Sequence, residues 1–231
     1  MIFGSCFIGK EGLFMVDVKE LTETVKKAVE AAPKRDFLES VDVAINLKDV
    51  DLKDTSKRFN IEVLLPNPPG KEVKIGAVAD PSLEVATKKA GFNTVLTKDD
   101  VEKLVSNPKQ AKKIARENDF FIASPSLMPF IGRSLGKFLG PRGKMPKPVP
   151  PTTDVEALLD QYKRTVRLRL RDTLVLNARV GTVDMDPAKI AENIMIVIEA
   201  LERKLEHGMN NIKAIIVKTT MGSPTKIDLK T

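Results

Sequence analysis

The chain has 231 residues, of which 38 are lysine or arginine and 31 are aspartate or glutamate, so its formal charge at pH 7 is +7. Hydrophobic residues make up 42% and charged residues 30%, which is typical of a folded globular protein and not of a disordered one. The single cysteine, Cys6, excludes a disulfide framework, and the single histidine, His207, excludes a metal site with two imidazole ligands. No apolar run is long enough to cross a membrane. These observations indicate a basic, cytoplasmic, non-enzymatic protein without a metal or a cofactor.

The N-terminal segment, residues 1–14, is apolar but interrupted by glycine, and no basic residues precede it. A secretory signal peptide has a basic start and a longer apolar core, so secretion is not expected. Met15 stands just before Asp17, where a capped helix is expected to begin. We therefore expect translation to start at Met15 and residues 1–14 to be a disordered tail or an artefact of an upstream start.

The first part of the chain combines one helix with two strands. Apolar residues recur at helical spacing from Asp17 to Pro33. Strict alternation over 41–47 predicts a half-buried strand, and a second strand is expected at 59–65. The sequence Pro-Asn-Pro-Pro-Gly at 66–70 then interrupts any regular element.

A different pattern follows, in which short buried strands alternate with helices. The expected strands are 73–78, 94–96 and 120–122, and the expected helices are 80–91, 98–105, 109–117 and 127–139. Such alternation predicts a small parallel sheet with helices on its faces. A second proline-rich segment closes this part at 146–151.

The first pattern resumes after the second proline-rich segment. The expected elements are a helix capped by Thr153, strands at 165–171 and 173–180, a long helix from Asp186 to Gly208, and a last strand at 212–217.

Two proline-rich segments that flank about 80 residues predict an inserted domain, since domain boundaries favour such linkers. Residues 15–66 and 154–231 would then form one discontinuous α+β domain, and residues 67–153 an inserted α/β domain. The alternative is a single continuous domain with proline-rich surface loops.

Basic residues gather in the glycine-rich segment 132–147, which contains no acidic residue. Its cations are Arg133, Lys137, Arg142, Lys144 and Lys147. Glycines let backbone N–H groups approach an anion, and cations neutralise phosphates, so the segment is a candidate phosphate contact. The alternative is a solvated basic loop. A nucleotide-hydrolysis loop is excluded, because Met145 stands where a serine or threonine must bind magnesium.

Two further segments are candidates for RNA contacts. Arg167, Arg169 and Arg171 alternate with apolar residues, so one face of a strand would present guanidinium groups, unless acidic residues of a neighbouring strand pair with them. The segment 218–224, Lys-Thr-Thr-Met-Gly-Ser-Pro, offers small hydroxyls that are suited to ribose 2′-hydroxyls, although by itself it is also an ordinary strand-to-turn transition. Aromatic residues are only 5% of the chain, which argues against a stacking platform for single strands.

Two long motifs in this sequence carry a family resemblance. They are Leu-Gly-Pro-Arg-Gly-Lys-Met-Pro-Lys-Pro at 139–148 and Val-Lys-Thr-Thr-Met-Gly at 217–222, supported by shorter segments at 35–40, 62–66 and 119–123. With these motifs, the chain resembles the L-one family of large-subunit ribosomal proteins in its archaeal branch, from about residue 16 to residue 227. Ser223 separates Gly222 from Pro224 where members commonly have Gly-Pro, so no role is assigned to Ser223 or Pro224.

The resemblance implies a discontinuous α+β domain with an inserted Rossmann-like domain. It implies a cytoplasmic protein of the large ribosomal subunit, monomeric when free, that binds ribosomal RNA at the mobile stalk near the tRNA exit site. Deacylated tRNA at that site and the mRNA of the protein's own operon, whose translation it would repress, are the other implied partners. The residues expected to contact RNA are Phe37, Glu39, Ser40, Lys218, Thr219, Thr220, Met221, Gly222, Arg167 and Arg169, with phosphate contacts from Arg142, Lys144 and Lys147.

Two other functions fit parts of the sequence. A two-domain enzyme or ligand-binding protein would close over an anionic metabolite, but the chain lacks a dinucleotide fingerprint and a metal cluster. A DNA-binding repressor would need a helix-turn-helix signal, which the sequence does not contain.

Overall fold

The computed structural model describes residues 18–33, 35–54, 57–150 and 153–227. The expected start at Met15 and the expected helix cap at Asp17 lie outside these residues. The described elements are α1 (Val18–Glu30), β1 (Ser40–Leu47), β2 (Phe59–Leu64), β3 (Ile75–Val78), α2 (Pro81–Lys89), β4 (Thr94–Leu96), α3 (Lys98–Ser106), α4 (Pro108–Glu117), β5 (Phe120–Ala123), η2 (Pro125–Leu127), α5 (Met128–Ser134), α6 (Gly136–Leu139), β6 (Lys147–Pro148), α7 (Val155–Lys163), β7 (Thr165–Leu170), β8 (Val175–Thr182), α8 (Pro187–Glu202), η3 (Gly208–Asn211), β9 (Ile212–Thr219) and β10 (Thr225–Ile227).

The chain divides into two compact units, which we call unit 1 and unit 2. Unit 1 consists of the described residues up to Val63 and from Leu168 onward, and unit 2 of Leu64–Arg167. Both boundaries fall within the paired strands β2 and β7. The mixed α+β and α/β class that the sequence predicts is confirmed.

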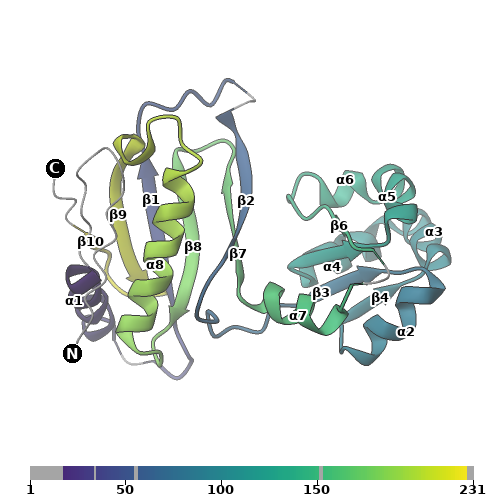
Figure 1. Cartoon of the computed structure of the whole chain (residues 1–231), viewed down its shortest axis with the longest axis horizontal. Coiled ribbons are helices and arrows are strands. Elements are labelled where there is room, and N and C mark those ends of the chain that lie inside the picture. The colour runs from purple at the N-terminus through teal and green to yellow at the C-terminus, as the bar shows by residue number, and fades with distance from the viewer. Residues whose placement is uncertain (1–17, 34, 55–56, 151–152, 228–231) are drawn as a thin grey trace. The chain divides into compact units, whose positions relative to one another are not determined.

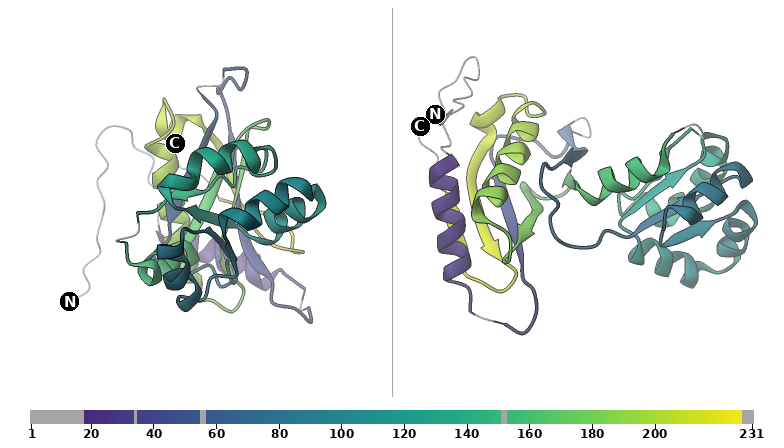
Figure 2. Two further views of the ribbon diagram at one scale, coloured as in Figure 1. Left: turned by 90° about the vertical axis from the view of Figure 1, so that its right-hand side faces the viewer. Right: turned by 60° about the horizontal axis from the view of Figure 1, so that its bottom comes forward.

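Unit 1 is a layer of helices on an antiparallel sheet. Within the described part of the chain, its strands are ordered β10-β9-β1-β8, so segments from both ends of the chain share one sheet. In β1, residues alternate between buried and half-buried, so one face of the sheet meets the core and the other faces outward. Helix α1 packs against α8, β9 and β10, and α8 packs against β8. Figure 1 shows α8 lying across β9, β1 and β8, and Figure 2 shows the same unit from two other sides.

Unit 2 contains a parallel sheet in the order β4-β3-β5-β6, counted over the described residues. Strands β3 and β5 are buried at every position, which requires helices on both faces of the sheet. One face packs against apolar residues of α3, α4, α5 and α6. The other face packs against α2 and α7.

Helix α7 belongs to unit 2, whereas the sequence prediction ended the inserted domain at residue 153. Val155 and Tyr162 of α7 are buried in the same core as Ile75 and Phe120, and the rings of Phe120 and Tyr162 lie 5.2 Å apart. The apolar face of α7 therefore assigns it to the parallel sheet, although it follows the proline-rich segment.

Three predicted helix ends differ in the structure. The helix expected at 127–139 is divided into α5 and α6 at Leu135. Asp154, and not Thr153, caps α7, because its carboxylate accepts from the N–H groups of Glu156 and Ala157. Helix α8 begins at its predicted cap, Asp186, but ends at Glu202; Gly208 begins η3 with a positive φ of 53°.

Candidate nucleic-acid interface

The candidate interface of unit 1 lies where β1 begins and β9 ends. The antiparallel register places Val41 opposite Thr219, so the residues just beyond this pair meet. The Thr220 N–H donates to the Ser40 carbonyl at 3.0 Å, and the Ser40 N–H donates to the Thr220 Oγ1 at 3.1 Å. The Thr220 hydroxyl in turn donates to the Ser40 carbonyl at 3.3 Å. Two motifs that are 180 positions apart in the chain therefore form one edge, which we call the Ser40–Thr220 edge.

The turn after β9 is closely packed around Thr219. Thr219 is fully buried, so its side chain supports the edge from inside and does not present its hydroxyl to solvent. The Gly222 N–H donates to the Thr219 carbonyl at 3.3 Å. A Cβ atom on Gly222 would lie 2.3 Å from the Thr219 Oγ1, which is far closer than real contacts allow. Gly222 is therefore a packing requirement of this turn.

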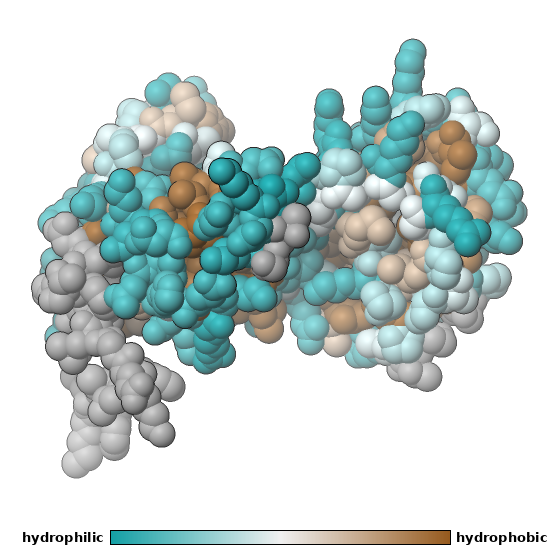
Figure 3. Space-filling model, turned by 90° about the horizontal axis from the view of Figure 1, so that it is seen from above, coloured by the Kyte–Doolittle hydropathy of each residue, from teal (hydrophilic) through white to brown (hydrophobic). Residues whose placement is uncertain are grey.

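Exposed apolar side chains flank the Ser40–Thr220 edge along the chain. Met221 is 58% exposed, and Phe37 and Leu38, which precede β1, are each 53% exposed. On the face that Figure 3 shows, most of the surface of unit 1 is hydrophilic, with a few hydrophobic patches. Large side chains left in solvent beside a motif are consistent with a binding surface.

Glu39 lies under this edge. It is only 5% exposed, and its backbone carbonyl accepts from the Val183 N–H at 3.0 Å. Among the described residues, neither carboxylate oxygen of Glu39 has a hydrogen-bond partner. Because a buried carboxylate without a donor is costly, a donor from a ligand would stabilise it.

The two arginines of β7, and Arg171 just after the strand, are engaged within the protein. The Arg167 guanidinium lies 4.5 Å from the centre of the Phe120 ring, and its Nη1 donates to the Asp119 carbonyl at 3.5 Å. Arg169 is half-buried and has protein partners of its own. Arg171 pairs with the adjacent Asp172 at 3.4 Å. The strand therefore does not present the free row of guanidinium groups that alternation alone suggests.

The glycines of the basic loop have a structural role. Gly143 has a φ of 67°, and its N–H donates to the Gly140 carbonyl at 2.9 Å. The Lys144 N–H donates to the Leu139 carbonyl at 3.0 Å. These two bonds form a Schellman motif, which ends a helix with a glycine in the left-handed region. The sequence interpretation, in which these glycines admit an anion, missed this local signal.

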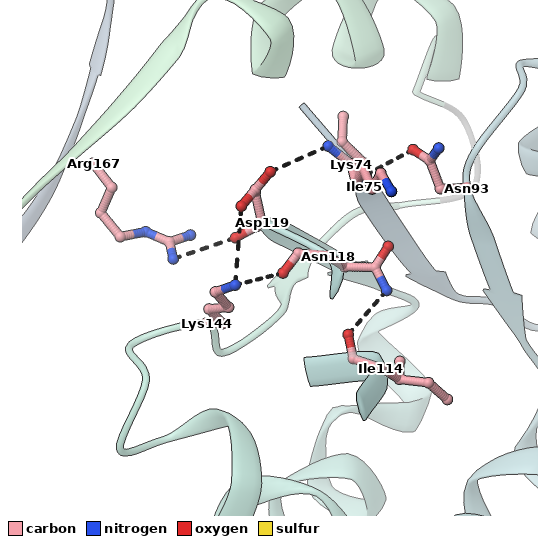
Figure 4. Close-up of polar contacts among 8 residues, drawn as sticks. All are labelled: Lys74, Ile75, Asn93, Ile114, Asn118, Asp119, Lys144 and Arg167. Carbon is pink, nitrogen blue, oxygen red and sulfur yellow. Dashed lines mark hydrogen bonds and ion pairs between the residues drawn. The ribbon is translucent and has the colours of Figure 1, made fainter. Parts of the chain in front are cut away.

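Lys144 ties the basic loop to the start of β5 (Figure 4). Its Nζ donates to the Asn118 carbonyl at 2.7 Å and lies 4.0 Å from the Asp119 carboxylate. Burial lowers the pKa of Lys144, Asp119 opposes that shift, and Arg167 and Arg142 add to it. Lys144 is thus an anchor of the loop, while Lys147 is exposed and Arg142 is half-buried like Lys144.

The cavity found in unit 1 is small for a metabolite site. A cavity of about 80 Å³ in unit 1 is lined by Asp49, Lys57, Phe59, Lys204 and neighbouring residues. Metabolite sites usually measure about 300–1,000 Å³. Over the same residues, no group of three or more His, Cys, Asp or Glu side chains is placed to hold a metal ion. The helices described are also too short or too polar to span a membrane.

Comparison with known proteins decides the family. A model of the Ribosomal protein L1p/L10e family matches residues 21–223. The chain belongs to this family. It is 47% identical over 209 residues to large ribosomal subunit protein uL1 of Methanothermobacter thermautotrophicus, covering 90% of this chain and 99% of that protein. It is 46% identical over 213 residues to the proteins of the same name from Thermococcus kodakarensis and Pyrococcus horikoshii, covering 92% of this chain and 98% and 97% of theirs.

Membership of the L1p/L10e family confirms the resemblance carried by the two motifs, including its archaeal branch. The family consists of structural ribosomal proteins, so the prediction that the chain is not an enzyme is confirmed. The cytoplasmic location follows as well, because the relatives are large-subunit proteins of the ribosome. The candidate RNA-contact residues stay predictions.

Proposed function

We propose that the chain is a structural protein of the large ribosomal subunit that binds ribosomal RNA at the mobile stalk near the tRNA exit site. The observation that carries the proposal is the Ser40–Thr220 edge, where the family segment 35–40 and the family motif 217–222 form three mutual hydrogen bonds. Such a preformed edge loses little conformational freedom on binding, which favours recognition of a folded RNA.

The chemistry of the edge suits ribose and base edges. Met221 would pack on sugars, while Ser40, Thr220 and the backbone of Gly222 exchange hydrogen bonds with 2′-hydroxyls. The Glu39 carboxylate would accept from a ribose hydroxyl or a base amino group, since it has no donor among the described residues. Phe37 and Lys218 would add contacts at the margins.

The basic surface of unit 2 has a secondary part in this proposal. Arg142 and Lys147 supply phosphate contacts, and Lys144 acts through the loop that it anchors. Arg167 and Arg169 contribute through the strand that they stabilise, because both already have protein partners. Specificity therefore resides in unit 1, and unit 2 adds charge.

The proposal has three further parts. The protein represses translation of its own mRNA, it contacts deacylated tRNA at the exit site, and it is monomeric when free. A messenger site that resembles the ribosomal one would use the same Ser40–Thr220 edge. The two RNAs should therefore compete for the protein, and a Thr220 variant should lose both together. Sedimentation of the free chain at micromolar concentration tests the monomeric state.

The first experiment is a salt titration of binding to a fragment of the ribosomal RNA stalk, with a scrambled RNA of equal length as the control. Tight binding to the stalk fragment alone, with a shallow dependence of log K on log salt, supports recognition of shape and ribose. Equal and steeply salt-dependent binding to both RNAs would show that charge alone drives it and would refute the proposal. An unlabelled messenger leader added as competitor tests repression in the same assay.

A further inference from the structure

The outward face of the unit 1 sheet carries a row of charged residues, of which only Lys218 belongs to a family motif. Strand β1 pairs with β8 on one side and β9 on the other, and Asp42 lies opposite Arg179 and also opposite Lys218. Arg179, Asp42 and Lys218 are therefore direct neighbours across adjacent strands. The residues that alternate with them, Val43, Ala178 and Val217, are buried against the helices, so this row lies on the opposite face.

The row is adjacent to the Ser40–Thr220 edge. Ser40 and Asp42 are two residues apart on β1, and Lys218 and Thr220 are two residues apart along β9 and its continuation. Residues two apart on a strand point to the same side and are separated by roughly 6–7 Å. If an RNA strand is bound at the Ser40–Thr220 edge, the phosphates that follow along that strand would therefore lie close to this row of charged residues.

The charges of the row suit a polyanion. Lys218 is exposed, and Lys226, which lies opposite Ile216 on the same face, is exposed as well. Arg179 is half-buried; its Nε is buried and has no hydrogen-bond partner among the described residues. Three cations thus share this face with one acidic residue, Asp42.

The carboxylate of Asp42 makes it less unfavourable for Arg179 and Lys218 to lie close together on neighbouring strands. Its carboxylate attracts both Arg179 and Lys218, and burial raises the pKa of Asp42 while these two cations oppose the shift. An acidic residue between two cations reduces their mutual repulsion and orients them outward. Asp42 is accordingly a positioning residue for the row.

We propose that Arg179 and Lys218 bind consecutive phosphates of the RNA strand that the Ser40–Thr220 edge recognises. The proposal rests on the proposed RNA-binding function and extends its surface from the edge onto the open sheet face. The row itself contains no aromatic side chain, so charge and not stacking would determine the contact.

The test measures binding of full-length Arg179→Gln to the stalk fragment over a range of salt concentrations. The matched control is Lys213→Gln, which removes one positive charge from an exposed position near the other end of β9. We expect Arg179→Gln to weaken binding about threefold to tenfold at low salt and to make the log–log salt slope shallower by about 0.7–0.9. Lys213→Gln should change neither quantity, and circular dichroism should show both variants folded.

Unchanged affinity and slope in a folded Arg179→Gln variant would overturn this inference. If the wild type prefers the stalk fragment and Thr220→Val weakens binding to it, while Arg179→Gln changes neither the affinity nor the salt slope, only the extended surface is refuted. If the wild type does not distinguish the stalk from the scrambled RNA, the proposed function itself is refuted. Normal binding of Arg179→Gln to free RNA with poor incorporation into large subunits would instead assign the face to a protein partner, and would also overturn the inference.

Discussion

Thr220 and Ser40 are joined by three hydrogen bonds, two of which use the Thr220 hydroxyl. That hydroxyl donates to the Ser40 carbonyl and accepts from the Ser40 N–H, so it is part of the backbone arrangement that holds β1 beside the turn after β9. If RNA binds this edge as proposed, the same side chain both forms the surface and contacts the RNA, so folding of the surface and binding are coupled.

Thr220→Val is expected to weaken binding to the stalk fragment by about 1–3 kcal/mol, because it removes a hydroxyl that is paired in the edge and in the complex. Thr220→Ser retains the hydroxyl and should stay within about 0.5 kcal/mol of the wild type. Titration calorimetry of both variants checks the prediction. Equal affinity of the folded valine variant and the wild type would remove Thr220 from the interface.

Met221→Asp should abolish most of the specific binding while leaving the melting temperature unchanged. Met221 is 58% exposed, so folding depends little on it, but a carboxylate there would repel phosphates. Met221→Ala, which removes only the packing, should cost less. The prediction is contradicted if the aspartate variant binds as tightly as the alanine variant.

Gly222→Ala is expected to lower the free energy of unfolding by about 1–3 kcal/mol, since the added methyl group overlaps Thr219. Gly132 in α5 provides a matched control, because a Cβ there meets no atom within 4 Å. Gly132→Ala should stabilise the protein by about 0.5–1 kcal/mol. Urea unfolding of the two variants measures both effects, and similar free energies would show that the turn adapts freely.

Lys144→Gln should destabilise the protein by about 1–2 kcal/mol, because the ammonium group donates to the Asn118 carbonyl in a partly buried site. Lys137→Gln, an exposed change in the same basic segment, should be nearly neutral. Thermal unfolding distinguishes the two roles of Lys144. A phosphate contact without an anchoring role would instead reduce the salt slope of RNA binding and leave the melting temperature unchanged.

Asp80 and Asp42 should affect stability in opposite directions as pH falls. Hydrogen bonds from Ser124 and Ser126 lower the pKa of Asp80 below 3.8, so its carboxylate stabilises the fold above that pH and this contribution is lost as pH falls through the lowered pKa. Burial raises the pKa of Asp42 above 3.8, so its charge costs stability at neutral pH. Asp80→Asn should therefore lower the melting temperature at pH 7, and Asp42→Asn should raise it. Both differences should shrink toward pH 3; a constant difference between pH 7 and pH 3 would contradict the linkage.

The element pattern was largely predictable because it depends on local spacing. Alternation over 41–47 and the buried stretch at 120–122 correspond to β1 and β5, and Asp186 caps α8 as expected. Helix ends were less predictable, since α8 ends at Glu202 with no proline or glycine next to it, and α5 ends at Ser134, where the sequence predicts that one helix continues through Gly136. The short strand β6 was missed because its two residues pair with β5 inside a proline-rich segment.

The candidate site was predictable as motifs but not as contacts. Residues 217–222 and 35–40 pointed to the family, yet spacing in the sequence does not show that Ser40 bonds Thr220 or that Thr219 is buried. For the basic segments, the sequence suggested more available cations than the structure has. Arg167 and Lys144 looked like free cations in the sequence, but each has partners that come from Asn118 to Phe120, distant in the chain.

By itself, the sequence determined the class of fold, the family and the general charge of this protein, because periodicity, caps, turns and long motifs are local properties of the chain. The tertiary structure decided which cations remain available and which are already paired, which glycine is required by packing, and which residues from the two ends of the chain meet. The physical reason is that hydrogen bonds, burial and electrostatic attraction depend on distances in space. The pairing of β1 with β8 and β9 alone places Asp42 between Arg179 and Lys218.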